Sequence, residues 1–153
     1  MPGRIKLTGA VRQVYKNLSP MMDPLNRRPT ILIAEDYEDN RELLRLLLAS
    51  ANYCVHEATN GRDCLAMARE NPPDLIMVDL SMPILDGWSL LEALKKDSKT
   101  ACIPCVAVTA HGDTDRQRAL EAGFNGYLSK PFRSFELFEL VARLLPPAGV
   151  LGA

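Results

Sequence analysis

The 153-residue sequence has no apolar run that approaches the roughly 20 residues needed for a membrane-spanning helix. Its basic N-terminus is not followed by a continuous apolar segment, so no secretory signal is recognised. Internal repeats and low-complexity segments are also absent. These absences argue against a membrane, secreted or repeat protein, and we expect a cytoplasmic location.

Cysteine is scarce, and the few thiols do not form a recognisable metal or redox site. The sequence has four cysteines, of which Cys102 and Cys105 form a C-x-x-C pair. No second Cys or His pair lies at zinc-ligand spacing. A redox C-x-x-C pair usually begins a helix, where the helix dipole lowers a thiol pKa, whereas this pair leads into the apolar run CIPCVAVT. Because disulfides are not expected in a cytosolic chain of this size, we interpret the pair as buried, unreactive thiols.

The net charge is only -1, but it is unevenly distributed. Residues 1–29 carry six basic groups and one acid, whereas the remaining residues carry twelve basic and eighteen acidic groups. An acidic domain behind a basic extension argues against a dedicated nucleic-acid binder. Four prolines and little periodicity in residues 1–29 predict a flexible extension, followed by one domain over 30–146 and a short tail over 147–153.

Between residues 30 and 146, short apolar runs alternate with helical patterns. The expected strands are Thr30–Ala34, Tyr53–Glu57, Asp74–Asp79, Ile103–Thr109 and Gly126–Ser129. The expected helices are Asp39–Ala51, Asn60–Ala68 with Asn60 as its cap, Trp88–Lys96, Asp113–Ala122 and Ser134–Leu145. Apolar strands in alternation with helices predict an α/β fold with a parallel sheet between two helix layers.

Polar side chains lie at the ends of four of the five expected strands. In chain order they are Glu35 and Asp36, Asp79, Thr109, and Lys130. In open α/β sheets, ligand sites lie outside the carboxyl ends of the strands. We therefore expect three carboxylates, one hydroxyl and one ammonium group to converge on a single edge of the sheet.

This set of groups suits phosphoryl-transfer chemistry. Three adjacent carboxylates repel one another unless a cation lies among them, and oxygen ligands with open positions suit Mg²⁺. A lysine and a threonine would bind phosphoryl oxygens, while one carboxylate could act as the nucleophile and form an aspartyl phosphate. Each group alone is more often a helix cap, a turn residue or a backbone partner. Their joint occurrence at the strand ends favours a functional site.

Four ordered motifs make the chain from about Thr30 to Leu145 resemble the receiver domain of bacterial response regulators. ILIAED resembles the first strand with its acidic pair, and VDLSMPILDGW resembles the phosphorylation loop. AVTAH resembles the switch strand, and GYLSKPF resembles the segment that carries the family's invariant lysine. The resemblance implies a flavodoxin-like, doubly wound (βα)5 fold whose five-stranded parallel sheet has the order 2-1-3-4-5.

The resemblance implies a phosphoacceptor role for Asp79, which would take a phosphoryl group from a phosphohistidine on a histidine kinase or histidine phosphotransfer protein. It implies that Lys130 pairs with the phosphoryl group and that Thr109 binds it after transfer. Tyr127 would be the aromatic switch that turns inward as Thr109 moves. The peptide bond between Lys130 and Pro131 would be cis.

The resemblance also implies a metal site. Glu35, Asp36 and Asp79 would hold Mg²⁺, or Mn²⁺ in its place, together with the backbone carbonyl of Ser81. The Glu-Asp pair departs from the commoner Asp-Asp, but the number of carboxylates is preserved. Ser81 and His111 occupy positions that tune the lifetime of the phosphoryl group in this family. His111 is alternatively a solvent-facing loop residue.

We expect a stand-alone receiver, because only eight residues follow the last expected helix. Such a chain would signal through protein–protein contacts as a monomer or weak dimer, without contacting nucleic acid directly and without acting as a turnover enzyme. The expected readout face comprises Asp113–Ala122, Gly126–Ser129 and Ser134–Leu145, because Thr109 and Tyr127 adjoin it.

Three alternatives remain open from the sequence. One is a receiver excised from a hybrid histidine kinase, with residues 1–29 as a linker remnant. Another is a Mg²⁺-dependent phosphatase with an Asp nucleophile, although that class has a second acid two residues later, where this chain has Ser81. The third is a degenerate receiver used only as a scaffold, which the complete set of site residues disfavours.

Overall fold

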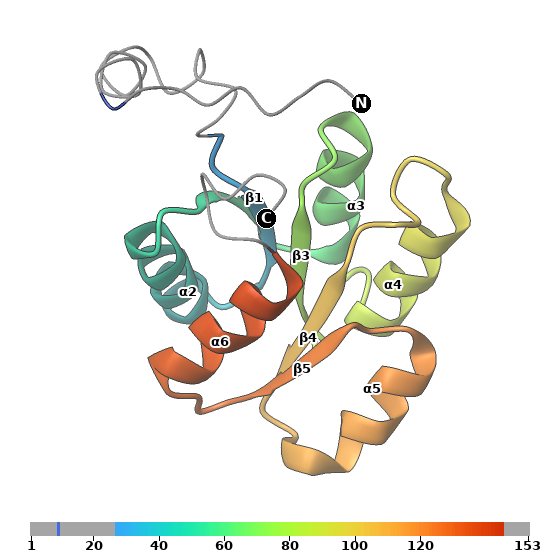
Figure 1. Cartoon of the computed structure of the whole chain (residues 1–153). Coiled ribbons are helices and arrows are strands. Elements are labelled where there is room, and N and C mark those ends of the chain that lie inside the picture. Colours follow the sequence, from blue (N-terminus) through green and yellow to red (C-terminus); the bar gives the residue numbers. More distant parts are fainter. Residues whose placement is uncertain (1–8, 10–26, 146–153) are drawn as a thin grey trace.

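The computed structural model describes residue 9 and residues 27–145. Five parallel strands form one sheet in the order β2-β1-β3-β4-β5 (Figure 1). The strands are β1 (Thr30–Ala34), β2 (Cys54–Ala58), β3 (Leu75–Asp79), β4 (Cys105–Thr109) and β5 (Gly126–Ser129). The α-helices of the main described segment are α2 (Glu38–Ser50), α3 (Gly61–Glu70), α4 (Gly87–Lys96), α5 (Arg116–Ala122) and α6 (Ser134–Leu144). The expected α/β class and strand order are confirmed, whereas most of residues 1–29 and all of 147–153 lie outside the described residues.

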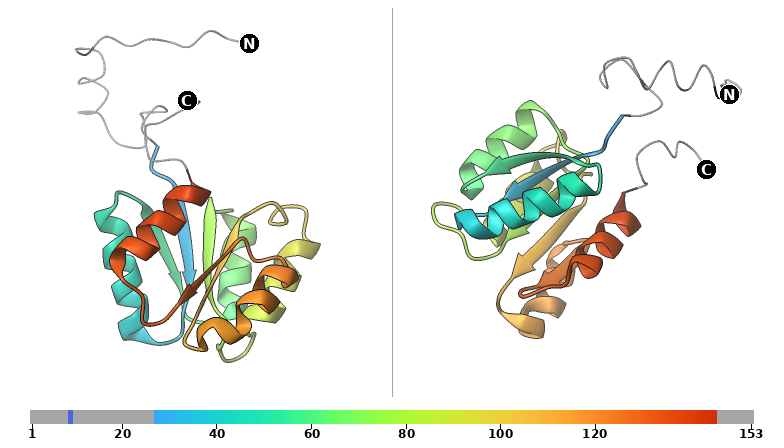
Figure 2. Two further views of the ribbon diagram at one scale, coloured as in Figure 1. Left: turned by 60° about the horizontal axis from the view of Figure 1, so that its bottom comes forward. Right: turned by 90° about the vertical axis from the view of Figure 1, so that its left-hand side faces the viewer.

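Two helix layers enclose the sheet and create two cores. Helices α2 and α6 cover one face, and α3, α4 and α5 cover the other (Figures 1 and 2). Along β1, Ile31 and Ile33 pack in the core beneath α2 and α6, whereas Leu32 and Ala34 pack in the core beneath the other three helices. Burial on both faces explains why the strand reads as a continuous apolar run. None of the described helices is long and apolar enough to cross a membrane.

Strand β4 begins at Cys105, two residues later than the sequence predicts. Pro104 has no N–H to donate to a strand ladder, although its carbonyl accepts a hydrogen bond from the Ile76 N–H at 3.0 Å. Cys105 is buried, and burial raises the pKa of its thiol to about 11. Cys102 lies exposed in the preceding turn, so the expectation that both thiols are buried is wrong for Cys102. All four cysteines are free thiols.

The helix expected over Asp113–Ala122 is divided into two parts. Residues Gly112–Asp115 form a 3-10 turn, and the α-helix α5 begins only at Arg116. Gly112 has a φ of 63°, in the left-handed region that favours glycine. Its carbonyl accepts a hydrogen bond from the Tyr127 hydroxyl, which ties the 3-10 turn to strand β5. The link between β4 and α5 is therefore a separate element rather than the first turn of a longer helix.

Candidate functional site

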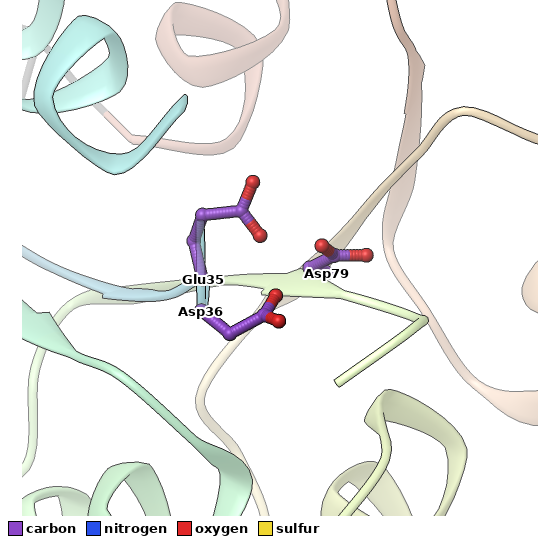
Figure 3. A group of neighbouring side chains, drawn as sticks. All are labelled: Glu35, Asp36 and Asp79. Carbon is purple, nitrogen blue, oxygen red and sulfur yellow. The ribbon is translucent and has the colours of Figure 1, made fainter. Parts of the chain in front are cut away.

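The carboxyl ends of β1 and β3 bring three carboxylates together. Glu35 and Asp36 directly follow β1, and Asp79 is the last residue of the neighbouring strand β3. One oxygen of each side chain lies within 4.8 Å of the others. Figure 3 shows the three carboxyl groups facing a common space. The expected acidic cluster is present, and such a set of oxygen ligands could hold a divalent cation.

Glu35 is the most deeply buried of the three acids, with a relative exposure of 1%. Its Oε1 accepts a hydrogen bond from the Lys130 Nζ at 2.7 Å, while its Oε2 is buried without a hydrogen-bond partner. Burial and the neighbouring Asp79 raise the pKa of this carboxyl group to about 7, although Lys130 opposes the shift. A buried carboxylate oxygen without a partner is costly, so this atom is suited to receive a cation or a proton.

Lys130 links the acidic cluster to β5, the strand at the edge of the sheet. It follows β5, and its backbone N–H donates to the Thr109 carbonyl at 2.8 Å. Besides its short contact with Glu35, its Nζ lies 3.5 Å from the Asp79 Oδ2. The peptide bond from Lys130 to Pro131 is cis. One ammonium group thus faces two carboxylates, and it lies within reach of any group added to Asp79.

The backbone around Asp79 is closely packed. Its Oδ1 accepts a hydrogen bond from the Ser81 N–H at 2.9 Å, so Asp79 also performs the ordinary turn-forming role of an aspartate. A Cβ at Gly87 would lie 2.7 Å from the Asp79 carbonyl oxygen, which leaves room only for glycine where α4 begins. The Asp79 side chain retains a relative exposure of 12%. Its carboxylate is therefore fixed in place but still reachable from solvent.

Ser81 and His111 contact each other between the loops that follow β3 and β4, at the edge of the sheet where Asp79 lies. The Ser81 hydroxyl lies 3.1 Å from the His111 Nε2, although the two residues are on the loops after β3 and β4. The His111 N–H donates to the hydroxyl oxygen of the buried Thr109 at 3.2 Å. His111 is thus exposed, as one alternative holds, and also bonded to the site. This contact could not be predicted from the sequence, because the two residues are thirty positions apart.

Tyr127 is buried, with a relative exposure of 7%, and burial raises the pKa of its phenol. It pairs with Ala107 in the parallel ladder of β4 and β5, while Thr109 pairs with Ser129. Its hydroxyl reaches the Gly112 carbonyl in the loop that follows Thr109. The two residues expected to form the switch are therefore connected through the start of the 3-10 turn.

Two features near the site were not anticipated from the sequence. The Arg41 Nη1 donates to the Glu35 carbonyl at 3.1 Å, which braces the end of β1 from helix α2. A groove of about 360 Å³ opens beside the Lys130 side chain. It lies between α2 and the segment after β5, and its lining residues are Asn40, Leu43, Leu44, Ala110, Lys130, Pro131 and Phe132. A helical pattern predicts the exposure of individual residues but not a groove formed with another segment.

A model of the response regulator receiver domain matches residues 31–142. The chain is 34% identical over 120 residues to the polar-differentiation response regulator DivK of Brucella anthropi, covering 78% of this chain and 98% of DivK. It is 40% identical over 115 residues to the response regulator PleD of Caulobacter vibrioides, covering 74% of this chain and 25% of PleD. The chain therefore spans nearly the whole of one relative but only a quarter of another.

Solved structures give the same result. The receiver domain of a sensor histidine kinase from Pseudomonas aeruginosa aligns with a TM-score of 0.71 and 31% identity. The alignment covers 76% of this chain and 97% of that domain. That structure has a magnesium ion coordinated in its active site cleft.

Proposed function

The chain belongs to the response regulator receiver family, and from that membership we propose that Asp79 is the residue that accepts the phosphoryl group. Receiver domains are signalling modules of two-component systems. The observation that carries the proposal is the convergence on Asp79 of two further carboxylates, one lysine and one threonine at a single edge of the sheet. No other strand-end aspartate has this combination of neighbours among the residues 27–145.

Transfer begins when an Asp79 carboxylate oxygen attacks the phosphorus of a phosphohistidine. A P–O bond forms, the P–N bond breaks, and its electron pair returns to the imidazole ring. Lys130, which lies between Glu35 and Asp79, pairs with an oxygen of the incoming phosphoryl group. Because little covalent assistance is needed, positioning and charge neutralisation supply most of the rate enhancement.

The donor set fits a divalent cation. The three carboxylates supply hard oxygen ligands, and the partnerless Glu35 Oε2 is the buried atom that a cation or its bound water would satisfy. Glu35, Asp36, Asp79 and the Ser81 carbonyl would hold Mg²⁺, with Mn²⁺ as a substitute. When bound, the cation neutralises charge that carboxylate and phosphoryl oxygens would otherwise bring together. The magnesium ion in the related kinase receiver supports this assignment.

Phosphorylation is read out at the end of the sheet formed by β4 and β5, which carry Thr109 and Tyr127. The phosphoryl group adds roughly two negative charges beside Asp79. The Thr109 hydroxyl then donates a hydrogen bond to a phosphoryl oxygen. This movement shifts the loop after β4, because the His111 N–H in that loop bonds the Thr109 hydroxyl oxygen and the Gly112 carbonyl accepts the Tyr127 hydroxyl. The change reaches α5, β5 and α6, whose outer surface binds the downstream protein.

The donor is a histidine kinase or histidine phosphotransfer protein, and the chain acts as a signalling switch rather than a turnover enzyme. Ser81 in place of a second acid disfavours the phosphatase alternative. A stand-alone receiver and the receiver of a hybrid kinase would share this site, and DivK and the Pseudomonas kinase represent the two cases. The cytoplasmic location stays a prediction.

Incubation of the full chain with acetyl phosphate and Mg²⁺ tests the proposal. We expect a slower band on a phosphate-affinity gel, abolished in Asp79→Asn and by chelation of the metal. Asp86→Asn is the matched control, because Asp86 lies in the same loop but caps α4 through the Ser89 N–H. A band that persists in Asp79→Asn would assign the phosphoryl group to another residue.

A further inference from the structure

Ile84 lies at the crest of the β3–α4 loop in a conformation that its side chain disfavours. Its φ is 72°, a left-handed value that β-branched residues rarely adopt. The Leu85 N–H donates to the Pro83 carbonyl at 2.8 Å, which closes a three-residue γ-turn around Ile84. The side chain is also 70% exposed. Neither burial nor backbone preference accounts for an isoleucine at this position.

The residues on either side of Ile84 hold the turn in place. Met82 is buried in the core beneath α3 and α4. Leu85 packs so closely on the start of α3 that a Cβ at Gly61 would lie 2.1 Å from the Leu85 carbonyl oxygen. Asp86 accepts the Ser89 N–H and begins α4. With both flanks anchored, the Ile84 side chain is held outward and cannot turn into the core.

The exposed isoleucine lies on the loop that begins at the proposed phosphoacceptor. It is five residues after Asp79, on the loop that also carries Ser81. The loop leads to α4 on one side of the sheet, whereas the groove lined by Leu43 and Phe132 opens toward α2 on the other side. Apolar surface thus flanks the site on both sides. We call the Ile84 loop and this groove the rim of the site. A protein that delivers a phosphoryl group to the recessed Asp79 carboxylate must cover this rim.

We propose that Ile84 is a docking contact for the protein that carries the phosphohistidine. Its side chain packs against apolar side chains next to the reacting histidine, while the groove beside Lys130 receives another part of the same protein surface. The strained γ-turn holds the isoleucine out for this contact. The inference rests on the proposed function, because it needs Asp79 as the acceptor.

Two phosphodonors separate the docking role from the chemistry. Acetyl phosphate reaches Asp79 without a protein surface, whereas a phosphorylated kinase must dock. The protein donor is the kinase that transfers fastest to the wild-type chain in a profile of the source organism's histidine kinases. Ile84→Asn removes the apolar side chain but tolerates the left-handed backbone. Leu46→Asn is the matched control, because Leu46 is an apolar residue of α2 that is 53% exposed and does not line the groove.

We expect Ile84→Asn to slow transfer from the phosphorylated kinase by about tenfold, as for a central interface contact. Its rate with acetyl phosphate should stay within about twofold of wild type, and Ile84→Val should retain most of the kinase rate. The melting temperature should not fall, because the substitution relieves backbone strain. Leu46→Asn should leave both rates unchanged.

Equal kinase rates for wild type and Ile84→Asn would overturn the docking role, and so would an equal loss with both donors, which indicates a distorted site. A wild-type chain that accepts phosphate from acetyl phosphate but from no kinase would also overturn it. Failure of the wild type with every donor would instead overturn the assignment of Asp79. Weakened binding of a downstream target without slower transfer would reassign Ile84 to the readout.

Discussion

Glu35 is subject to opposing effects that decide how the site responds to pH. Burial and Asp79 favour the protonated form, while the ion pair with Lys130 favours the charged form. Burial prevails, and the pKa of Glu35 rises from an ordinary 4.5 to about 7. Between these pH values the folded protein holds a proton that the unfolded chain releases, so the metal-free protein loses stability as pH rises through this window.

Urea unfolding of the metal-free protein between pH 4.5 and 7.5 measures this effect. With a chelator present, wild type should lose about 1–3 kcal/mol relative to Glu35→Gln as pH rises, because glutamine has no proton to release. Referring each point to Glu35→Gln cancels the titrating groups that do not interact with Glu35, which leaves Glu35 with its neighbours Asp79 and Lys130. A wild type that instead gains stability relative to the variant would mean that Lys130 dominates and that the pKa is lowered.

The hydrogen bond between Ser81 and His111 predicts an effect on the lifetime of the phosphoryl group. The two side chains contact each other between the loops after β3 and β4, next to Asp79 at the end of β3, so removing either should let water reach the acyl phosphate more easily. We expect His111→Ala and Ser81→Ala each to shorten the half-life of the phosphorylated form severalfold. The double variant should add little, because both changes break one contact. Decay after removal of the donor is the measurement.

The other histidine of the chain provides the control for this experiment. His56 lies exposed on β2, away from the opening, and His56→Ala should leave the half-life unchanged. A longer half-life in His111→Ala would contradict the shielding role and would indicate that the imidazole assists hydrolysis.

At the scale of the elements, the start of α3 supports the loop that carries Ser81 and Ile84. Gly61→Ala should destabilise the protein by about 1–3 kcal/mol, because the new Cβ would overlap the Leu85 backbone. It should also slow phosphorylation by acetyl phosphate, since the loop must shift. Arg62→Ala is the control, an exposed neighbour on the same helix, with an expected change within about 0.5 kcal/mol. Urea denaturation compares the variants, and unchanged stability of Gly61→Ala would refute the close packing.

The strands and most helices could be predicted because their signals are local. The apolar run Leu75–Asp79 is buried on both faces, and Asn60 accepts the Asp63 N–H as the cap of α3. The division of the helix before Arg116 could not be predicted, because it involves a contact from Tyr127 on another strand. The left-handed backbone of Ile84 could not be predicted either, because β-branched residues rarely adopt a positive φ.

The candidate site was predictable as a set of residues but not as a network. Strand topology alone brings Asp36, Asp79 and Thr109 to one edge. The sequence does not reveal that Lys130 pairs with Glu35 rather than with Asp79 alone, because this depends on the length of the glutamate side chain. The motifs identify the residues of the site, but they do not predict contacts that long side chains make between different strands.

For the whole molecule, we expect phosphorylation to change the elements at the β4–β5 end of the sheet and to leave the β2 end unchanged. Addition of beryllofluoride, an acyl-phosphate analogue, should shift backbone amide resonances of α5, β5 and α6. The residues of α3 beyond its first turn should shift little, because they pack away from Thr109 and Tyr127. Two-dimensional NMR spectra of wild type and Asp79→Asn make the comparison. Unchanged resonances over α5, β5 and α6 would refute this face as the readout surface.

The assignment of Asp79 is tested most directly by locating the phosphoryl group. The chain is phosphorylated with acetyl phosphate and Mg²⁺, the acyl phosphate is reduced with borohydride, and the peptides are sequenced by mass spectrometry. We predict one reduced residue, homoserine in place of Asp79, and none in Asp36 or Asp86. Reduction at any other carboxylate, with Asp79 intact, would contradict the account.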